Sequence, residues 1–281
     1  RSPSRGLGDV YKRQDILNEE AEWIEPELED LPGYKPTLEA NPKMIQQAVD
    51  LILNSKKPVL YVGGGIIHSK ANKELFELST KYNIPVVTTL MGRGAFPDGH
   101  ELCIGMPGMH GNYTATTSIQ KSDLLIALGV RFDDRVTANP DFFAQNAKVI
   151  HADIDPAEIG KVREPEVPIV GDAKSVIKGL IEKLGNSEIK NKDWLSEIQE
   201  MKKNYPLTYN QEEKGPLKVP YVLEELQKMA QKDSIVVSGV GQHQMWISLH
   251  WKFTSPNTWL NSGGLGTVSY THLTLPTTPY V

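Results

Sequence analysis

The chain has 281 residues, a formal net charge of −5, 39% hydrophobic residues and 23% charged residues, a balance typical of globular proteins and too apolar for a disordered one. It contains no apolar run of about 18 residues, which excludes a membrane span, and no lysine and arginine block that would indicate a nucleic-acid surface. The single cysteine, Cys103, excludes an internal disulfide and a cysteine-rich zinc site. Since no signal peptide is visible, we expect a cytoplasmic protein of a prokaryote.

The two ends of the chain differ in composition from the middle. Residues 1–14 carry four basic residues and one acidic residue, and residues 268–281 contain no Asp, Glu, Lys or Arg. Both resemble translated adapter sequence, so we predict that they are artefacts. The alternatives are a genuine basic arm and a genuine edge strand. On the first interpretation, residues 15–267 are a fragment of a longer protein.

A linker and a helix precede the regular part of the sequence. Residues 15–40 are acidic and contain three prolines, which predicts a linker from a preceding domain. Asn41 and Pro42 are typical of a helix start, because Asn caps the first turn and Pro there loses no needed N–H. Apolar residues at helical spacing follow at Ile45, Ala48, Val49 and Ile52.

Short apolar runs then alternate with helical patterns. The predicted helices cover residues 71–82, 113–121 and 174–184, and a glycine-rich loop extends to about residue 111. Apolar strands separated by helices indicate an α/β fold with a parallel sheet covered on both faces. The predicted strands are residues 58–62, 84–90, 123–129, 148–155 and 168–172.

A second unit is predicted after a polar stretch. Residues 186–218 predict a helix followed by an inter-domain linker. A helix is then predicted over 219–231 and a strand over 234–239. They begin a second unit, and the part of it that ends at residue 267 is too short to be a whole domain.

The segments that follow the predicted strands carry Gly, Thr, Arg or Asp. Ligands of open parallel sheets bind at the carboxyl ends of the strands, where backbone N–H groups point outward. These residue types therefore favour a long ligand with a charged centre, such as a dinucleotide. The segments are residues 63–65, 88–92, 129–136, 153–156 and 171–173.

Individual side chains in these segments have two alternative roles. Arg131 and Arg135 can neutralise a pyrophosphate, or can form surface pairs with Asp133 and Asp134. Asp153 can accept a hydrogen bond from a ribose hydroxyl, or can cap a short helix, for which the aspartate two residues later is the better candidate.

Familiar catalytic motifs are absent from the sequence. The triple glycine 63–65 allows close backbone approach to a ligand, but the segment does not complete G-x-G-x-x-G because His68 occupies the sixth position. The seven histidines show no metal-binding spacing, and no G-x-S-x-G motif indicates a serine hydrolase. His110 and His243 are flanked by glycine, so we expect them on loops near a ligand; capping or solvent-exposed histidines are the alternative.

The motifs together resemble those of one enzyme family. KKPVLYVGGGI, PVVTTLMGRGAFP, GMPGMHG, SDLLIALGVRFDDRVT, HADIDPAEIGK, PIVGDA, VGQHQMW and WLNSGGLGT occur in the order and spacing of acetohydroxyacid (acetolactate) synthase catalytic subunits. The resemblance covers nearly all of residues 15–267. It implies that residues 41–185 are a Rossmann-like, FAD-binding central domain and that residues 219–267 are the truncated start of a thiamine-diphosphate-binding α/β domain, with linkers at 15–40 and 186–218.

The resemblance also assigns cofactor contacts. It implies FAD contacts at Gly63, Gly64, Gly65, Thr89, Leu90, Met91, Met109, His110, Gly129, Arg131, Asp133, Arg135, Val136, Asp153, Ile154, Gly171, Asp172, Ala173, Gln244, Met245, Gly263 and Gly264. It implies diphosphate contacts at Val240, Gly241, Gln242 and His243 and a pyrimidine contact at Gly266. It assigns no catalytic residue and no metal ligand to this sequence.

The sequence departs from the family where the catalytic machinery is expected. The family continues GGLGT with Met-Gly-Phe-Gly, whereas Val268 and Ser269 follow here. The GDG…N motif that ligates Mg²⁺ and the glutamate that activates thiamine diphosphate are also missing. We therefore expect the chain alone to be inactive, and to be a monomer or to aggregate through apolar surface.

The resemblance implies that the parent protein condenses two pyruvates, or pyruvate and 2-ketobutyrate, with loss of CO₂ in branched-chain amino-acid biosynthesis. It implies FAD without net redox chemistry, a homodimer or tetramer, and a small regulatory subunit. The alternatives are glyoxylate carboligase or pyruvate oxidase, which share the central fold, and a non-catalytic nucleotide-binding module. A nicotinamide dehydrogenase is disfavoured because the glycine fingerprint is absent.

Overall fold

The computed structural model describes residues 20, 22 and 35–263. The predicted artefacts at 1–14 and 268–281, most of the predicted linker 15–40, and the site residues Gly264 and Gly266 lie outside the described residues. The described residues 36–263 belong to one compact unit. Within the described residues, no helix has both the length and the apolar character needed to cross a membrane.

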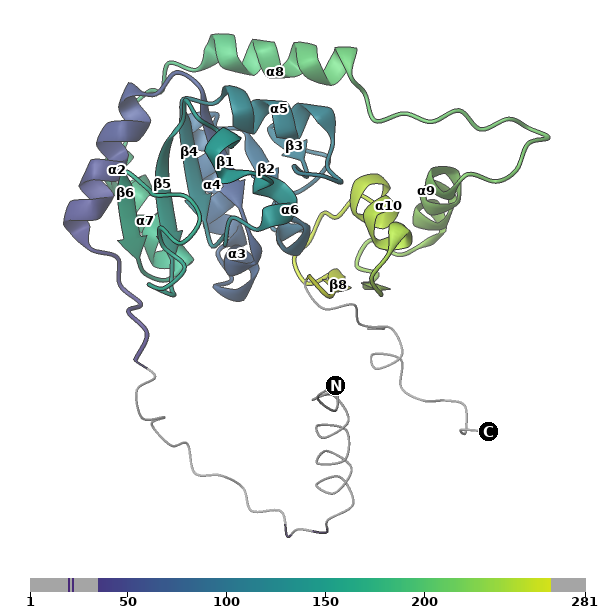
Figure 1. The fold of residues 1–281 in the computed structure, drawn as a ribbon, viewed down its shortest axis with the longest axis horizontal. Helices are drawn as coiled ribbons and strands as arrows, with labels where there is room; N and C mark the ends of the chain where they lie inside the picture. The colour runs from purple at the N-terminus through teal and green to yellow at the C-terminus, as the bar shows by residue number, and fades with distance from the viewer. Residues whose placement is uncertain (1–19, 21, 23–34, 264–281) are drawn as a thin grey trace, which may run out of the picture. The chain divides into compact units, whose positions relative to one another are not determined.

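A six-stranded parallel sheet forms the centre of this unit, in the order β3–β2–β1–β4–β5–β6 (Figure 1). The chain runs outward from β1 to β3, returns to β4 beside β1, and runs outward again to β6. The direction of the crossovers therefore reverses between β1 and β4. This sheet confirms the predicted parallel α/β fold. The strands are β1 (Pro58–Val62), β2 (Val86–Thr88), β3 (Cys103–Gly105), β4 (Leu124–Leu128), β5 (Lys148–Asp153) and β6 (Val167–Val170).

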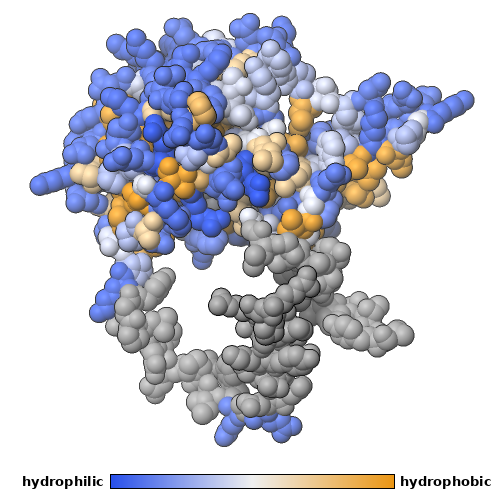
Figure 2. All heavy atoms as spheres, in the orientation of Figure 1, coloured by the Kyte–Doolittle hydropathy of each residue, from blue (hydrophilic) through white to orange (hydrophobic). Residues whose placement is uncertain are grey.

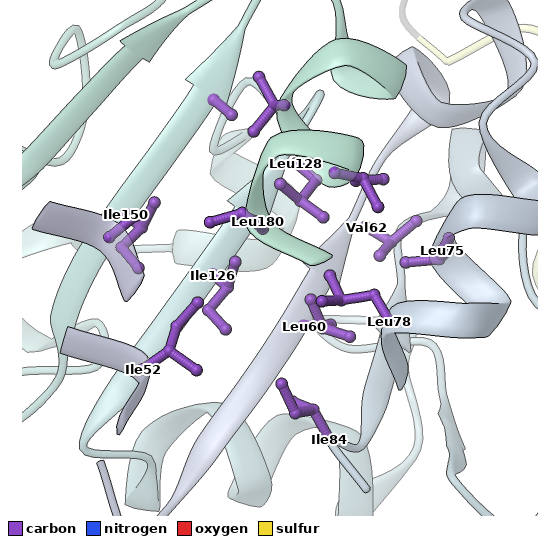
Figure 3. Close-up of a cluster of buried hydrophobic side chains, with 14 of the residues drawn as sticks. Ile52, Leu60, Val62, Leu75, Leu78, Ile84, Ile126, Leu128, Ile150 and Leu180 are labelled. Carbon is purple, nitrogen blue, oxygen red and sulfur yellow. The ribbon is translucent and has the colours of Figure 1, made fainter. Parts of the chain in front are cut away.

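Helices cover both faces of the sheet. Alternating residues of β1 enter different cores: Leu60 and Val62 join one, whereas Val59 and Tyr61 join the other. The first core packs against α2 (Pro42–Asn54), α4 (Asn72–Tyr82) and α7 (Ala173–Leu184), and Figure 3 shows part of it. The second packs against α5 (Tyr113–Lys121) and α8 (Lys192–Asn204), the helix predicted within 186–218.

The described residues 219–263, called the second part of the unit below, contain two helices and two strands. These are α9 (Val219–Met229), β7 (Val236–Ser238), α10 (Gln242–His250) and β8 (Trp259–Asn261), with β7 and β8 paired in parallel. The sequence did not predict α10, because its buried side chains Gln244, Ser248 and His250 are polar and give no apolar period. His243 therefore lies on a helix and not on a loop, which corrects the prediction from its flanking glycine.

Several short elements near the strand ends were also not predicted. The triple glycine leads directly into a one-turn helix, α3 (Gly64–His68). The remaining elements are η1 (Leu90–Gly92), α6 (Asp134–Thr137) and η2 (Pro140–Phe142). The predicted short helix at residue 156 is absent: the Asp155 carboxylate accepts a bond from the Ala157 N–H in a turn without helix.

Candidate functional site

A cavity of about 660 Å³ lies at the carboxyl ends of β1 and β4, where the strand order reverses. This is the position at which open parallel sheets bind ligands. Its walls also include segments after β2 and β5, together with α10 and the end of β8. The predicted site residues that line it are Gly63, Gly64, Gly65, Thr89, Leu90, Met91, His110, Gly129, Arg131, Asp133, Arg135, Val136, Asp153, Val240, Gln244, Met245 and Gly263.

Other predicted site residues do not line this cavity. Asp172 caps α7, with its carboxylate accepting bonds from the Lys174 and Ser175 N–H groups. Its own N–H donates to the Leu38 carbonyl at 2.9 Å, which places this strand end against the chain that precedes α2. The full set outside the lining is Met109, Ile154, Gly171, Asp172, Ala173, Gly241, Gln242 and His243.

Two glycines of the triple-glycine segment bring the ends of β1 and β4 together. A Cβ on Gly63 would lie 2.1 Å from the Gly129 carbonyl oxygen, and a Cβ on Gly65 would lie 2.6 Å from the Gly129 Cα. The Gly65 N–H donates to the Gly129 carbonyl at 3.2 Å. These glycines are therefore required by contact between two backbones, whereas the sequence suggested only close approach to a ligand. Gly64 differs, since its Cβ would meet only Met91, at 3.4 Å.

The rim after β4 carries two arginines and two aspartates. The side chains of Arg131 and Arg135 are 63% and 69% exposed, and their guanidinium groups lie 3.8 Å from the carboxylates of Asp133 and Asp134, respectively. These long contacts are weak surface pairs. The Asp133 carboxylate also accepts a 3.0 Å bond from the Arg135 N–H and so caps α6. Both arginines remain accessible to an anion in the cavity.

The part of the cavity wall after β5 is acidic. Asp153, Asp155 and Glu158 line the cavity there. Burial raises the pKa of Asp153, and the bond that its carboxylate accepts from the Asp155 N–H, at 2.9 Å, counteracts part of that rise. The cavity thus has a carboxylate cluster after β5, and two guanidinium groups with the Asp133 carboxylate beside them after β4.

Buried aromatic side chains that were not predicted from the sequence lie beneath the rim after β4. Tyr61 and Phe132 both line the cavity and meet edge to face, with ring centroids 5.6 Å apart. Burial raises the pKa of Tyr61. The His151 ring contacts Phe132 at 4.9 Å, and its Nε2 lies 2.9 Å from the Val130 carbonyl. The continuous apolar run of β1 was the available signal for the burial of Tyr61.

Residues from the second part of the unit close the cavity. Gln244 is buried, and its Nε2 donates to the Ser262 carbonyl at 2.9 Å, which ties α10 to the end of β8. The Trp259 Nε1–H donates to the Leu90 carbonyl at 3.2 Å. A Cβ on Gly263 would lie 2.7 Å from the Met91 sulfur, so a larger residue there would require the Met91 side chain to shift.

Two family descriptions match the chain. "Thiamine pyrophosphate enzyme, central domain" matches residues 45–180, which include the six-stranded sheet. "Thiamine pyrophosphate enzyme, C-terminal TPP binding domain" matches residues 239–272. The chain belongs to the thiamine pyrophosphate enzymes. The cavity lies between the parts that the two descriptions match, since the Gly63–Gly65 and Val240–Met245 stretches both contribute to its walls.

Among thiamine pyrophosphate enzymes, the chain is similar to acetolactate synthases. It is 50% identical to the "Acetolactate synthase" of Mycobacterium leprae and to the "Acetolactate synthase large subunit" of Corynebacterium glutamicum, over 95% of this chain and 43% of each relative. It is 44% identical to the "Probable acetolactate synthase large subunit" of Methanocaldococcus jannaschii, over 87% of this chain and 42% of that protein. The chain therefore spans less than half the length of these relatives, and the resemblance seen in its motifs is confirmed.

Proposed function

We propose that the chain is the FAD-binding and initial thiamine-diphosphate-binding part of an acetolactate synthase catalytic subunit. The names of its relatives support the activity. The observation that carries the FAD proposal is the cavity at the reversal of the strand order, with two exposed arginines after β4 and a carboxylate cluster after β5. The strand order is also that of doubly wound sheets that bind dinucleotides.

The lining of the cavity suits the parts of FAD. Arg131 and Arg135 would hold the pyrophosphate, because guanidinium groups bind phosphate oxygens with charge-assisted hydrogen bonds. Asp153 would accept a bond from a ribose hydroxyl. The apolar side chains of Met91 and Met245 would face the flavin ring. FAD in this proposal undergoes no net redox change.

The thiamine diphosphate proposal concerns the beginning of α10. Val240, Gly241, Gln242 and His243 would form part of the diphosphate site, and Val240 also lines the cavity. Bound thiamine diphosphate supplies the electron sink for decarboxylation of pyruvate. Among the described residues, no cluster of three or more His, Cys, Asp or Glu is placed to hold a metal ion, so we assign no Mg²⁺ ligand.

The synthase activity is proposed for a longer protein that includes this region. Such a protein would join two pyruvates, or pyruvate and 2-ketobutyrate, with loss of CO₂. We propose a homodimer or tetramer with a small regulatory subunit for it, and we expect the 281-residue chain alone to be inactive. Formation of acetolactate from pyruvate by the longer protein tests the activity, whereas formation of acetate and peroxide would support a pyruvate oxidase instead.

An FAD titration of the chain tests the cofactor proposal. We expect quenching of flavin fluorescence, and binding at least tenfold weaker for Arg131→Ala and Arg135→Ala, because one charge-assisted hydrogen bond contributes about 1.5–3 kcal/mol. Lys148→Ala is the matched control, since it removes one positive charge from the opposite end of β5. If the folded wild-type chain does not bind FAD, or if all three variants bind equally, the proposal is wrong.

A further inference from the structure

A buried ion pair outside the cavity lining joins the two parts of the unit. Arg93 Nη1 and Nη2 donate to the two carboxylate oxygens of Asp98 at 2.7 and 2.6 Å, and Nη1 also donates to the Thr88 hydroxyl at 3.1 Å. The two charged side chains are only 4% and 8% exposed. Neither residue lines the cavity. The sequence alone indicates no role for either residue.

The same carboxylate holds the backbone of the second part. The Phe253 N–H donates to Asp98 Oδ2 at 2.7 Å, and the Asp98 N–H donates in return to the Phe253 carbonyl at 3.1 Å. The Phe253 ring is 1% exposed and lies 5.7 Å from the Arg93 guanidinium carbon. Asp98 therefore binds both backbone groups of one residue that lies 155 positions away in the sequence.

The contacts around this point are close and continuous. Gly94 has a φ of +83°, and a Cβ on it would lie 2.5 Å from the Ser255 carbonyl oxygen. The Phe253 ring packs at 5.2 Å against Trp259, whose Nε1–H reaches the Leu90 carbonyl. The chain from Phe253 to Trp259 is thus fixed to the segment after β2. It connects α10 with β8, and these two elements carry the outer wall of the cavity.

A buried ion pair is a poor source of net stability, because removing two charges from water offsets most of their attraction. The geometry of the Arg93–Asp98 pair says more about its role than its contribution to stability does. The arginine fork orients the Asp98 carboxylate, and that carboxylate is the acceptor for the Phe253 N–H. Loss of the acceptor leaves a buried N–H without a partner, whereas removal of the charges alone does not.

We propose that Arg93 and Asp98 are positioning residues that set the location of the outer cavity wall. By fixing Phe253, they hold the segment between α10 and β8, and through it the side chains of Val240, Gln244 and Met245. Neither residue contacts a ligand in this proposal. The pair acts on ligand binding through the backbone that it anchors.

Two double variants of the full chain test this role. Arg93→Met with Asp98→Asn removes both charges and keeps an acceptor for the Phe253 N–H. Arg93→Met with Asp98→Leu removes both charges and the acceptor. By hydrogen exchange in the absence of ligand, we expect the Phe253 amide to exchange at least tenfold faster in the Leu variant, with the amides of β1 and β4 unchanged in both.

Equal exchange at Phe253 in the two variants would overturn the proposal. So would equally faster exchange throughout β1 and β4 in the Leu variant, because that result indicates general destabilisation. The second readout rests on the proposed function: FAD should bind about tenfold more weakly to the Leu variant than to the Asn variant. A wild-type chain that binds no FAD would refute the FAD proposal, and the exchange comparison would still decide the role of the pair.

Discussion

Glycine at the end of β1 has different roles at adjacent positions. Gly65 contacts the Gly129 backbone, and neither main chain can move aside as a flexible side chain can. Gly64 faces Met91 at an ordinary contact distance. The sequence shows only three equivalent glycines, because the partner of each one comes from a strand more than 60 residues away or from the loop after β2. The glycine motif could be predicted, but not its division of roles.

We predict that Gly65→Ala lowers the free energy of unfolding by about 1–3 kcal/mol or more, the usual cost of overpacking. Gly64→Ala should leave it unchanged or raise it slightly, because alanine is favoured over glycine in helices such as α3. Urea denaturation of both variants measures the difference. Gly99→Ala is the control, since a Cβ there meets no atom within 4 Å. Equal losses for Gly64→Ala and Gly65→Ala would contradict this assignment.

The burial and hydrogen bonding of His151 favour its neutral form. A carbonyl can only accept, so its Nε2 must carry the hydrogen that binds the Val130 carbonyl. The buried Nδ1 has no hydrogen-bond partner, and a proton there would be unpaired. Burial lowers the pKa of His151 below its ordinary value of 6.5, although the nearby Asp153 and Glu158 oppose this shift.

The stability of the chain should therefore fall in mild acid. Below about pH 6.5 the unfolded chain takes up a proton at this histidine that the folded chain does not, so the free energy of unfolding decreases until the lower folded pKa is reached. We predict a weaker pH dependence for His151→Gln, whose amide can donate to the Val130 carbonyl and does not titrate. Urea denaturation between pH 7.5 and 5 tests this. The same dependence in wild type and variant would exclude His151 as its source.

At the scale of elements, long regular segments could be predicted and short ones could not. The apolar runs of β1 and β4 and the periodicity of α2 and α7 follow from local sequence. In contrast, β3 has three residues and joins the sheet through pairing with β2, which no local pattern shows. The helix α10 could not be predicted because its buried side chains are polar and give no apolar period. Of the residues singled out from the sequence, those after β1, β2 and β4 largely line the cavity, whereas those after β6 do not.

The element α8 shows which of its contacts stabilise the fold. Trp194 is 1% exposed, and its Nε1–H donates to the Pro58 carbonyl at 3.2 Å. Glu197 instead forms ion pairs with Lys57 at 2.7 Å and Lys121 at 2.9 Å while remaining 31% exposed. Trp194 fills part of the core on one face of the sheet, whereas the ion pairs of Glu197 are partly exposed to solvent. Their contributions to stability should therefore differ.

We predict that Trp194→Ala lowers the free energy of unfolding by about 3–5 kcal/mol, the usual cost of removing a buried tryptophan. Trp194→Phe should lose less, because it keeps an aromatic ring and loses the hydrogen bond. Glu197→Gln should cost at most about 1 kcal/mol, as is usual for exposed ion pairs. Guanidinium denaturation at equal ionic strength compares them. A larger loss for Glu197→Gln than for Trp194→Ala would show that the ion pairs dominate.

At the scale of the whole molecule, the two parts that form the cavity differ in how much apolar surface they bury. The six-stranded sheet has large cores on both faces. The part from α9 to β8 buries few large apolar side chains, chiefly Leu223, Phe253 and Trp259. Figure 2 shows apolar side chains at the surface over α9, where Leu226 is 50% and Met229 84% exposed. This part should therefore open before the sheet unfolds.

A ligand that contacts both parts should suppress this opening. We predict that, without ligand, protease cleaves first between residues 230 and 258, and that the sheet survives as a protected fragment. FAD at about 100 times its dissociation constant should stabilise the closed form by about 2.7 kcal/mol and slow this cleavage about 100-fold. Limited proteolysis with mass spectrometry of the fragments measures both effects. If FAD binds and protects the sheet but leaves cleavage at 230–258 unchanged, the wall formed by α10 and β8 does not contact the cofactor, and only the sheet would hold it.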